Sequence, residues 1–324
     1  MLVSRGVGPF SKGELVSEPQ SGILPQPRES ALFLILRLSD RARDGAEVAR
    51  IAASLPARIA SLSKRRKTSR LVGVVGFGFS LWETLSPGRR PARFRPFTKL
   101  ASEGRIAPAT GGDLLVHLVA SRPDVCCEIA WRLRDDLGTR VEVMDEVHGF
   151  QYFDSRDLTG FIDGTENPTG RARAKAALIG REDPAFAGGS YVFTQRYVHD
   201  LAAWSRLAIA EQEQVIGRRK HDSKELSARA KPPTAHIARV VIEEAGEELE
   251  IVRHSFPYGT SAERGLFFIA YTRDLAIPEA MLRHMVGTTG DGLHDRLMEF
   301  TRAVSGATFF APSLRALRAL SAMR

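Results

Sequence analysis

Residues 113–153, with the sequence DLLVHLVASRPDVCCEIAWRLRDDLGTRVEVMDEVHGFQYF, contain a predicted strand, a helix and a second strand in immediate succession. Residues 113–120 form an apolar run of strand length. Residues 121–137 have apolar side chains at helical spacing, with Ser121 as the expected N-terminal cap. Residues 139–153 alternate between apolar and polar side chains, which is typical of a strand. This unit predicts a mixed α+β fold.

The chain before this unit supplies the rest of one α+β pattern. The run ALFLILRL (31–38) predicts a strand, and residues 70–79, RLVGVVGFGF, predict another. Residues 43–62 have helical spacing, and Pro56 is expected to kink or end that helix. The complete order is β-α-β-β-α-β, the ferredoxin-like arrangement.

The second half repeats this order of elements without a detectable repeat of sequence. We therefore predict the α+β class, with two ferredoxin-like (βαββαβ) halves whose antiparallel sheets have helices packed on them. The expected division is an irregular N-terminal arm over 1–30, an N-terminal ferredoxin-like domain over 31–153 and a C-terminal ferredoxin-like domain over 154–324. The elements expected in the second half are strands at 191–200, 248–256, 265–274 and 307–312, helices at 201–217 and 277–287, and a helical turn within 294–304.

Composition excludes several classes of protein. The 324 residues are 43% apolar, which is too high for disorder, and no apolar stretch reaches the ~20 residues of a membrane span. The net charge is +8, and basic residues are concentrated in 64–70 and 89–99. These two segments are either solvated loops or a weak surface for an anionic partner. Neither has the aromatic platforms of a nucleic-acid site, so no nucleic-acid partner is expected.

The cysteines and the N-terminus bear on the cellular compartment. Cys126 and Cys127 are adjacent, a spacing that rarely reaches disulfide geometry and provides too few ligands for a zinc or iron–sulfur site. The N-terminal residues lack both a continuous apolar core and an Arg-Arg pair, which argues against export. We expect a cytoplasmic protein that does not associate with a membrane.

Two long irregular segments, 154–180 and 218–236, lie outside the repeated pattern, and such segments are often functional. The first contains GFIDGTENP (160–168). Asp-Gly and Asn-Pro pairs are typical of turns, so a simple turn is one interpretation. The apolar Phe161 and Ile162 favour a loop that enters the interior, where an aspartate costs free energy unless it is paired or used.

Two further segments contain candidate functional residues. In IVRHSFPYG (251–259), an extended strand would place Arg253 and Ser255 on one face and His254 on the other. The alternative for Arg253 is a surface ion pair with the glutamates of 243–250. His236 follows Lys-Pro-Pro-Thr-Ala, and this restricted backbone makes it either an axial metal ligand or a structural histidine.

Taken together, these motifs resemble the dye-decolourising (DyP-type) haem peroxidases, in that family's order along the chain. The resemblance covers most of residues 18–320. Within the family, the chain resembles the bacterial cytoplasmic subgroup that includes the YfeX-like proteins. The blocks that carry it are EPQSGILPQPRESALFLILRL (18–38), GFIDGTENP, VIGRRKHDSKEL (215–226), His236, IVRHSFPYG, FFIAYTRD (267–274) and DRLMEFTRAVSGATFFAP (295–312).

The resemblance implies haem b (iron protoporphyrin IX) bound in the C-terminal half. It implies that His236 is the proximal iron ligand and that Asp295 is the acidic partner of this histidine. It further implies that Asp163 is the distal acid–base residue and that Arg253 is the distal arginine, which also contacts the cofactor. The remaining residues implied to lie at the haem are Gly164, Thr165, Glu166 and Ser255, the last at a position where relatives often have asparagine.

The activity implied is that of a peroxidase that reduces hydrogen peroxide and oxidises dyes or other small aromatic reductants. A single positioned carboxylate can take a proton from peroxide and return it, and an arginine supplies a fixed positive charge. The family also implies a homo-oligomer. Two alternatives are a haem-handling protein for transport or iron release, with incidental peroxidase activity, and a haem-free binding module. The Asp163 and Arg253 pair favours the enzyme.

Overall fold

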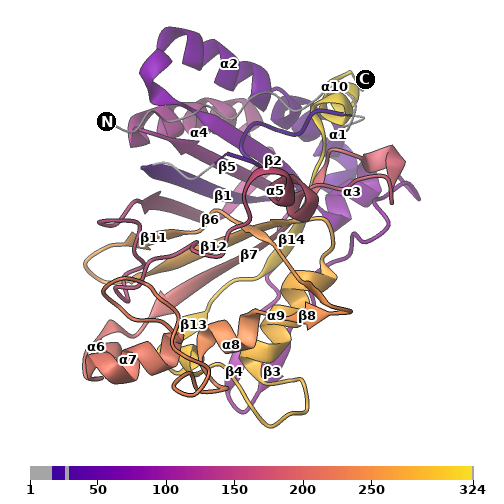
Figure 1. Cartoon of the computed structure of the whole chain (residues 1–324). Coiled ribbons are helices and arrows are strands. Elements are labelled where there is room, and N and C mark those ends of the chain that lie inside the picture. The colour runs from indigo at the N-terminus through magenta and orange to yellow at the C-terminus, as the bar shows by residue number, and fades with distance from the viewer. Residues whose placement is uncertain (1–16, 26–28, 323–324) are drawn as a thin grey trace.

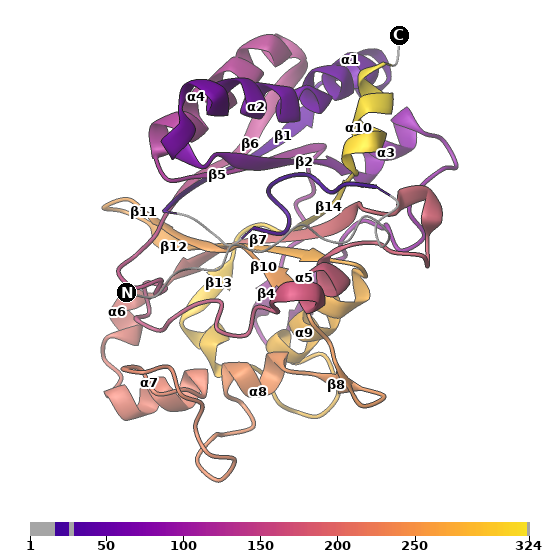
Figure 2. The same cartoon turned by 45° about the horizontal axis from the view of Figure 1, so that its top comes forward.

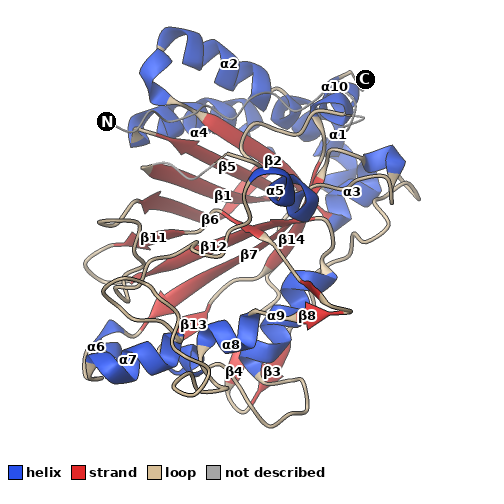
Figure 3. Ribbon diagram, in the orientation of Figure 1, coloured by secondary structure: helices blue, strands red, loops and turns tan. Residues whose placement is uncertain are grey.

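The computed structural model describes residues 17–25 and 29–322, so most of the irregular arm predicted over 1–30 lies outside the described residues. Figures 1 and 3 show the arrangement of the elements. The strands are β1 (Ser30–Leu38), β2 (Val72–Gly78), β3 (Leu100–Ser102), β4 (Arg105–Ala107), β5 (Leu114–Ala120), β6 (Val141–Phe150), β7 (Ser190–His199), β8 (Glu243–Glu244), β9 (Glu247–Glu248), β10 (Val252–Arg253), β11 (Phe256–Gly259), β12 (Arg264–Thr272), β13 (Thr301–Ala303) and β14 (Ala307–Ala311). The α-helices are α1 (Arg41–Ala53), α2 (Leu55–Arg65), α3 (Phe79–Leu85), α4 (Pro123–Leu137), α5 (Gly170–Ala177), α6 (Leu201–Trp204), α7 (Ile209–Ile216), α8 (His236–Val240), α9 (Ala276–Val286) and α10 (Leu314–Ser321), and the 3-10 helices are η1 (Lys67–Ser69), η2 (Gly138–Arg140), η3 (Pro184–Phe186) and η4 (Arg296–Glu299).

The strands form two ferredoxin-like sheets that join at their edges, as the repeated order predicts. The first half has the order β6-β1-β5-β2, and the second has β14-β7-β12 with β10 and β11 beside β12. All of these pairings are antiparallel. The pairs β14–β2 and β11–β6 connect the two sheets. Figure 2 shows the sheets facing each other, with α1, α2 and α4 outside the first and α7, α8 and α9 on the far side of the second.

Strand β1 is buried on both faces, which explains its continuous apolar sequence. Leu32 and Leu34 belong to the core on the helix-covered side. Phe33 faces the second sheet, where its ring stacks on Phe267 with 4.2 Å between centroids. Because successive side chains of a strand point to opposite faces, both layers must be apolar.

No helix in the described part of the chain is long and apolar enough to cross a membrane.

Two predictions about helix boundaries have different outcomes. The helical pattern over 43–62 is interrupted as expected, since α1 ends at Ala53 and Pro56 lies in the first turn of α2, where proline is tolerated. The predicted cap of α4 is wrong. The residue at the N-cap is Arg122, which makes no capping hydrogen bond, and the Ser121 hydroxyl accepts a hydrogen bond from Arg70 instead.

The helix predicted over 201–217 is two helices, α6 and α7. The Glu211 side chain accepts a hydrogen bond from the backbone N–H of Ala208 at 3.0 Å, and this contact starts a new helix. The strand predicted over 248–256 was also wrong in its extent, because β9 ends at Glu248 and the pairing with β12 begins at Val252. That pairing continues in one register to Gly259.

The core between the sheets contains a buried polar cluster. His117 Nδ1 lies 2.7 Å from the Tyr271 hydroxyl. Arg173 donates to His254 Nε2 at 2.8 Å. Burial lowers the pKa of His117 to about 3. Burial, followed by the neighbouring His117 and Arg173, lowers the pKa of His254 well below its ordinary value. Both imidazoles are therefore neutral in the folded protein at neutral pH.

This cluster predicts acid sensitivity of the fold. In the unfolded chain both histidines bind protons near pH 6.5, whereas in the folded chain they do so only at much lower pH. The free energy of unfolding should therefore fall as the pH drops below about 6.5 toward 3, by up to ~1.4 kcal/mol per pH unit for each histidine. Urea unfolding between pH 7.5 and 5 measures this slope.

The variant His117→Gln should lower the free energy of unfolding at neutral pH and give a shallower slope, because one of the two buried imidazoles is gone. The variant His221→Gln, which replaces a highly exposed histidine, is the matched control. An unchanged slope in His117→Gln would contradict this explanation.

Candidate active site

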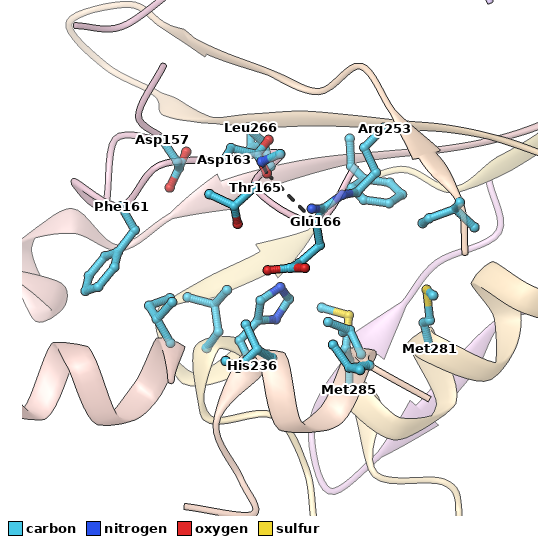
Figure 4. A pocket seen from close by; sticks show the side chains of 18 of the residues that line it. Asp157, Phe161, Asp163, Thr165, Glu166, His236, Arg253, Leu266, Met281 and Met285 are labelled. Carbon is cyan, nitrogen blue, oxygen red and sulfur yellow. Dashed lines mark hydrogen bonds and ion pairs between the residues drawn. The ribbon is translucent and has the colours of Figure 1, made fainter. Parts of the chain in front are cut away.

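The second half contains a cavity that is partly open to solvent. Its walls come from the loop over 157–166, strands β7, β10 and β12, helices α8 and α9, and the residues around η4. Apolar side chains such as Leu266, Met281 and Met285 line much of it (Figure 4). A cavity whose surface is largely apolar and whose polar groups converge on one space is the usual form of a cofactor or substrate site.

His236 points into the cavity from the first residue of α8 (Figure 4). The backbone N–H of Ala235 donates to the carbonyl of Pro232 at 3.0 Å, so the prolyl segment fixes the entry into the helix. His236 Nδ1 lies 2.6 Å from Asp295 Oδ2, and the Asp295 side chain is completely buried. This contact leaves Nε2 as the imidazole nitrogen available to a group in the cavity.

Asp163 and Arg253 lie together on the opposite side of the cavity from His236 (Figure 4). Arg253 Nη1 is 3.9 Å from Asp163 Oδ1, and both side chains are mostly buried. Asp163 Oδ1 also accepts a hydrogen bond from the backbone N–H of Gly164 at 2.7 Å. The pair thus presents one carboxylate and one guanidinium to the same space.

Asn167 connects the loop that carries Asp163 to the strand that carries Arg253. Its carboxamide oxygen accepts a hydrogen bond from the backbone N–H of Arg253 at 2.8 Å, and its Nδ2 donates to the Arg253 carbonyl at 2.9 Å. The GFIDGTENP loop is therefore fixed to β10 through the asparagine of its own motif. From the sequence, Asn167 was only a turn residue, because its partner is 86 positions away.

The other residues predicted at the site have different positions. Gly164, Thr165 and Glu166 line the cavity. Ser255 is not among the lining residues, and its hydroxyl accepts a hydrogen bond from the backbone N–H of Ile269 at 3.4 Å. Asp295 does not line the cavity either and acts on it only through His236.

A second polar group, which the sequence pattern did not predict, lies on the cavity wall. His199 Nε2 lies 3.2 Å from Asp157 Oδ1, and His199 Nδ1 lies 2.8 Å from the Thr301 hydroxyl. Burial raises the pKa of Asp157, but hydrogen bonds from His199 and Thr159 together outweigh it, so the net direction is downward. His199, expected to be structural, thus contributes to the cavity through a partner that lies 42 residues away.

Two buried polar atoms at the cavity have no partner within the described residues. They are Nε2 of Gln195 and Nε of Arg218. The Nη2 atom of Arg218 contacts Glu166. Because buried polar groups are nearly always hydrogen-bonded, both atoms are donors available to a bound group. Arg218 lies within the block VIGRRKHDSKEL, where only its neighbourhood indicated a role.

The Asn167 contacts predict a measurable loss when they are removed. The variant Asn167→Ala lacks both hydrogen bonds, at about 1 kcal/mol each, so the free energy of unfolding should fall by about 2 kcal/mol. Hydrogen exchange at the amides of Asp163 and Gly164 should accelerate, because the loop is released. The variant Asn167→Asp keeps the acceptor and should lose about half as much. Unchanged exchange in Asn167→Ala would show that other contacts position the loop.

The comparisons with known proteins all identify the same family. Residues 20–151 match the family model "Dyp-type peroxidase, N-terminal", and residues 154–316 match "Dyp-type peroxidase, C-terminal". A dye-decolorizing peroxidase from Mycobacterium tuberculosis is 42% identical over 90% of this chain and 89% of its own length. The structure of DyPB from Rhodococcus jostii RHA1 has a TM-score of 0.88 at 42% identity, covering 92% of this chain and 97% of that one. A variant of that protein, in complex with heme, has the same TM-score and identity.

Proposed function

Because the chain belongs to the Dyp-type peroxidase family, we propose that it is a haem-dependent peroxidase in which His236 binds the iron and Asp163 and Arg253 act on peroxide. The observation that carries these assignments is the position of His236 across one cavity from the other two side chains. The cofactor is haem b, as the haem complex of the related Rhodococcus protein supports.

The residues of the cavity fit a haem. His236 offers one imidazole nitrogen, because its other nitrogen is engaged by Asp295. The walls are largely apolar, as a porphyrin face requires. The unpartnered Nε of Arg218 is a buried cationic donor, suited to a propionate. Arg253 offers a second guanidinium to the same group.

On the proximal side, the chain fixes both the orientation and the basicity of one imidazole. Asp295 accepts the Nδ1 proton of His236, and its other oxygen accepts a hydrogen bond from the backbone N–H of Leu297 at 2.9 Å. A carboxylate held in this way increases the electron donation of the histidine to a metal. Bound haem supplies the redox chemistry of the reaction, and the chain supplies the ligand and its electronic tuning.

On the distal side, the chain moves a proton and stabilises charge. Peroxide must lose a proton from one oxygen and gain one on the other before the second oxygen leaves as water. The carboxylate of Asp163 can accept the first proton and deliver it to the second oxygen. The guanidinium of Arg253 stays protonated and stabilises the negative charge that develops as the O–O bond breaks.

The alternative of a haem-handling protein is not favoured. Storage or transport needs an iron ligand and an apolar cavity, but not a carboxylate and a guanidinium held 3.9 Å apart over the open side of the site. The curated relatives are named as peroxidases. The haem-free binding module is not favoured either, since a haem complex is known for a protein 42% identical to this chain.

The substrates and the setting of the protein extend the same proposal. The peroxidase takes hydrogen peroxide as the electron acceptor and a small aromatic molecule or dye as the reductant, as the relatives' names support. We infer that the protein is cytoplasmic, because Cys126 and Cys127 are both free thiols. We also infer that the protein forms a homo-oligomer. Light scattering of the purified protein tests this directly.

The assignment of His236 predicts loss of the cofactor. The variant His236→Ala, produced with adequate iron, should bind little haem, because the other imidazole that lines the cavity, that of His199, has both nitrogens engaged by Thr301 and Asp157. Visible absorption measures haem content, and added imidazole should restore part of the spectrum. His148→Ala, which removes a half-exposed histidine on β6, is the matched control. A normal spectrum in His236→Ala would exclude this residue as the ligand.

The two distal residues should differ in importance. Water can partly replace a missing proton carrier, whereas Arg218, the other arginine that lines the cavity, is paired with Glu166 and is a poor substitute for Arg253. Losing such a donor typically costs ~10²–10³ in rate. Arg253→Leu should therefore slow the reaction with peroxide more than Asp163→Asn does. Rapid mixing with peroxide measures both rates.

Arg302→Leu, at an exposed arginine of β13, is the control for a general effect of lost charge. A near-normal rate in Arg253→Leu would reverse the ranking. Equal losses in all three variants would point to general destabilisation.

A further inference from the structure

We propose that Arg239 positions the Asp295 carboxylate on the imidazole of His236 and thereby tunes the ligand of the haem iron. This inference rests on the proposed function and adds a positioning residue to it. Arg239 lies three residues after His236 in α8, and its exposed fraction is only 5%. An arginine this buried is costly unless its charge is paired and its donors are bonded. Its partners therefore show what it holds together.

The guanidinium of Arg239 joins α8 to the end of α9 and to the chain that follows α9. The two helices lie next to each other in Figures 1 and 2. Nε donates to the carbonyl of His284, in the last turn of α9, at 3.2 Å. Nη1 donates to the carboxylate of Asp291 at 2.8 Å, and Nη2 donates to the hydroxyl of Thr289 at 3.4 Å. One rigid fork of donors thus fixes three points, a geometry that the ammonium of a lysine does not reproduce.

Asp291 transmits this contact to the backbone around it. Both neighbours of Asp291 are glycines with positive φ, 84° and 72°, so the chain here is flexible unless other contacts fix it. Its Oδ1 accepts hydrogen bonds from the backbone N–H of Leu293 at 3.0 Å and from the Thr289 hydroxyl at 2.9 Å. Arg239, followed by these two donors, lowers the pKa of Asp291 well below its usual range. The segment over 289–293 is therefore folded around a charged carboxylate.

The segment held by Arg239 leads directly to Asp295. Just beyond it, the backbone N–H of Arg296 donates at 3.0 Å to the carbonyl of Thr234, two residues before His236. The contact of His236 Nδ1 with Asp295 Oδ2, at 2.6 Å, lies between this bond and the Arg239 fork along the chain of α8. Without Arg239, the approach to Asp295 loses its anchor on α8, and the carboxylate is free to move away from the imidazole.

Displacement of the carboxylate has an electronic consequence. A histidine whose Nδ1–H is bound by a carboxylate donates more strongly to a metal and so stabilises its higher oxidation state. With a looser contact, His236 donates less, and the reduction potential of the holoenzyme rises. Loss of the Arg239 charge alone acts the other way, because removal of a positive charge near the haem lowers this potential. The sign of the shift therefore separates positioning from a simple effect of charge.

The first test is a redox titration of the holoenzyme, followed by visible absorption. Arg239→Met removes all three contacts and should raise the reduction potential. Arg239→Lys keeps the charge but not the fork, so it should raise the potential without any opposing effect of charge. The iron–histidine stretching frequency of the reduced protein should fall in the variant whose potential rises. A rise in either variant supports the proposal, and an unchanged or lower potential in both overturns it.

Arg105→Met is the matched control. Arg105 of β4 donates to the Val286 carbonyl at 3.0 Å and thus binds the end of the same helix through a different contact. This variant should leave the potential unchanged. A shift equal to that of the Arg239 variants would come from general loosening of α9 and would overturn the positioning role.

The dependence on Asp295 is tested by combining variants. Asp295→Asn should itself raise the potential, because the amide binds Nδ1–H more weakly than a carboxylate does. In that background Arg239→Met should cause no further rise, since the group through which Arg239 acts is gone. A further rise in the double variant would show a different route to the haem and would contradict the proposal.

Hydrogen exchange of the full chain without haem tests the positioning independently of the cofactor. The amide of Leu293 should exchange about tenfold faster or more in Arg239→Met, because its acceptor Asp291 is released, and at the normal rate in Arg105→Met. Normal exchange in Arg239→Met overturns the proposal. If the parent protein binds no haem, the proposed function is wrong, while this measurement still decides whether Arg239 holds the segment.

Discussion

Two hydrogen bonds between the carboxamide of Asn167 and the backbone of Arg253 hold the loop of Asp163 against the second sheet. They satisfy a donor and an acceptor on a strand only two residues long, where backbone partners are scarce. The distance between the Asp163 carboxylate and the Arg253 guanidinium follows from this contact. The open side of the cavity therefore depends on an asparagine that need not touch substrate.

The opposite side of the cavity depends on a buried carboxylate. The Asp295 side chain is fully buried, a position that is costly for a charge unless it is paired. One oxygen is satisfied by His236 and the other by the backbone of η4. The same contacts that make the buried charge tolerable orient the imidazole toward the cavity. These two interactions thus both stabilise the buried carboxylate and position His236.

The duplicated fold explains why the site lies in only one half. In the first half α1, α2 and α4 cover the outer face of the sheet with apolar side chains, which leaves a solid core. In the second half the chain between β7 and β12 is irregular over 217–235, and α7 and α8 are short. These elements stand away from the sheet over β7 and β12, and the cavity lies beneath them. The loop of Asp163 closes it from the side of the first half.

The sequence by itself determined the elements that local pattern controls. The apolar run of 31–38 is a strand because both of its faces are buried, and Pro56 separates two helices because it cannot continue the first. The GFIDGTENP motif lies in the loop that lines the cavity of the second half. What the sequence could not provide was any contact between distant segments, such as Asn167 with Arg253 or Asp157 with His199.

Local competition also escaped the sequence pattern. The strand predicted over 248–256 begins only at Val252 and is divided at 254–255, where the Ser255 hydroxyl accepts a hydrogen bond from the N–H of Ile269. The short helix α8, which carries His236, has too few residues for a periodic signal. Only the tertiary structure decided these features, because each depends on a hydrogen-bond partner or a packing surface that chain folding brings from elsewhere in the sequence.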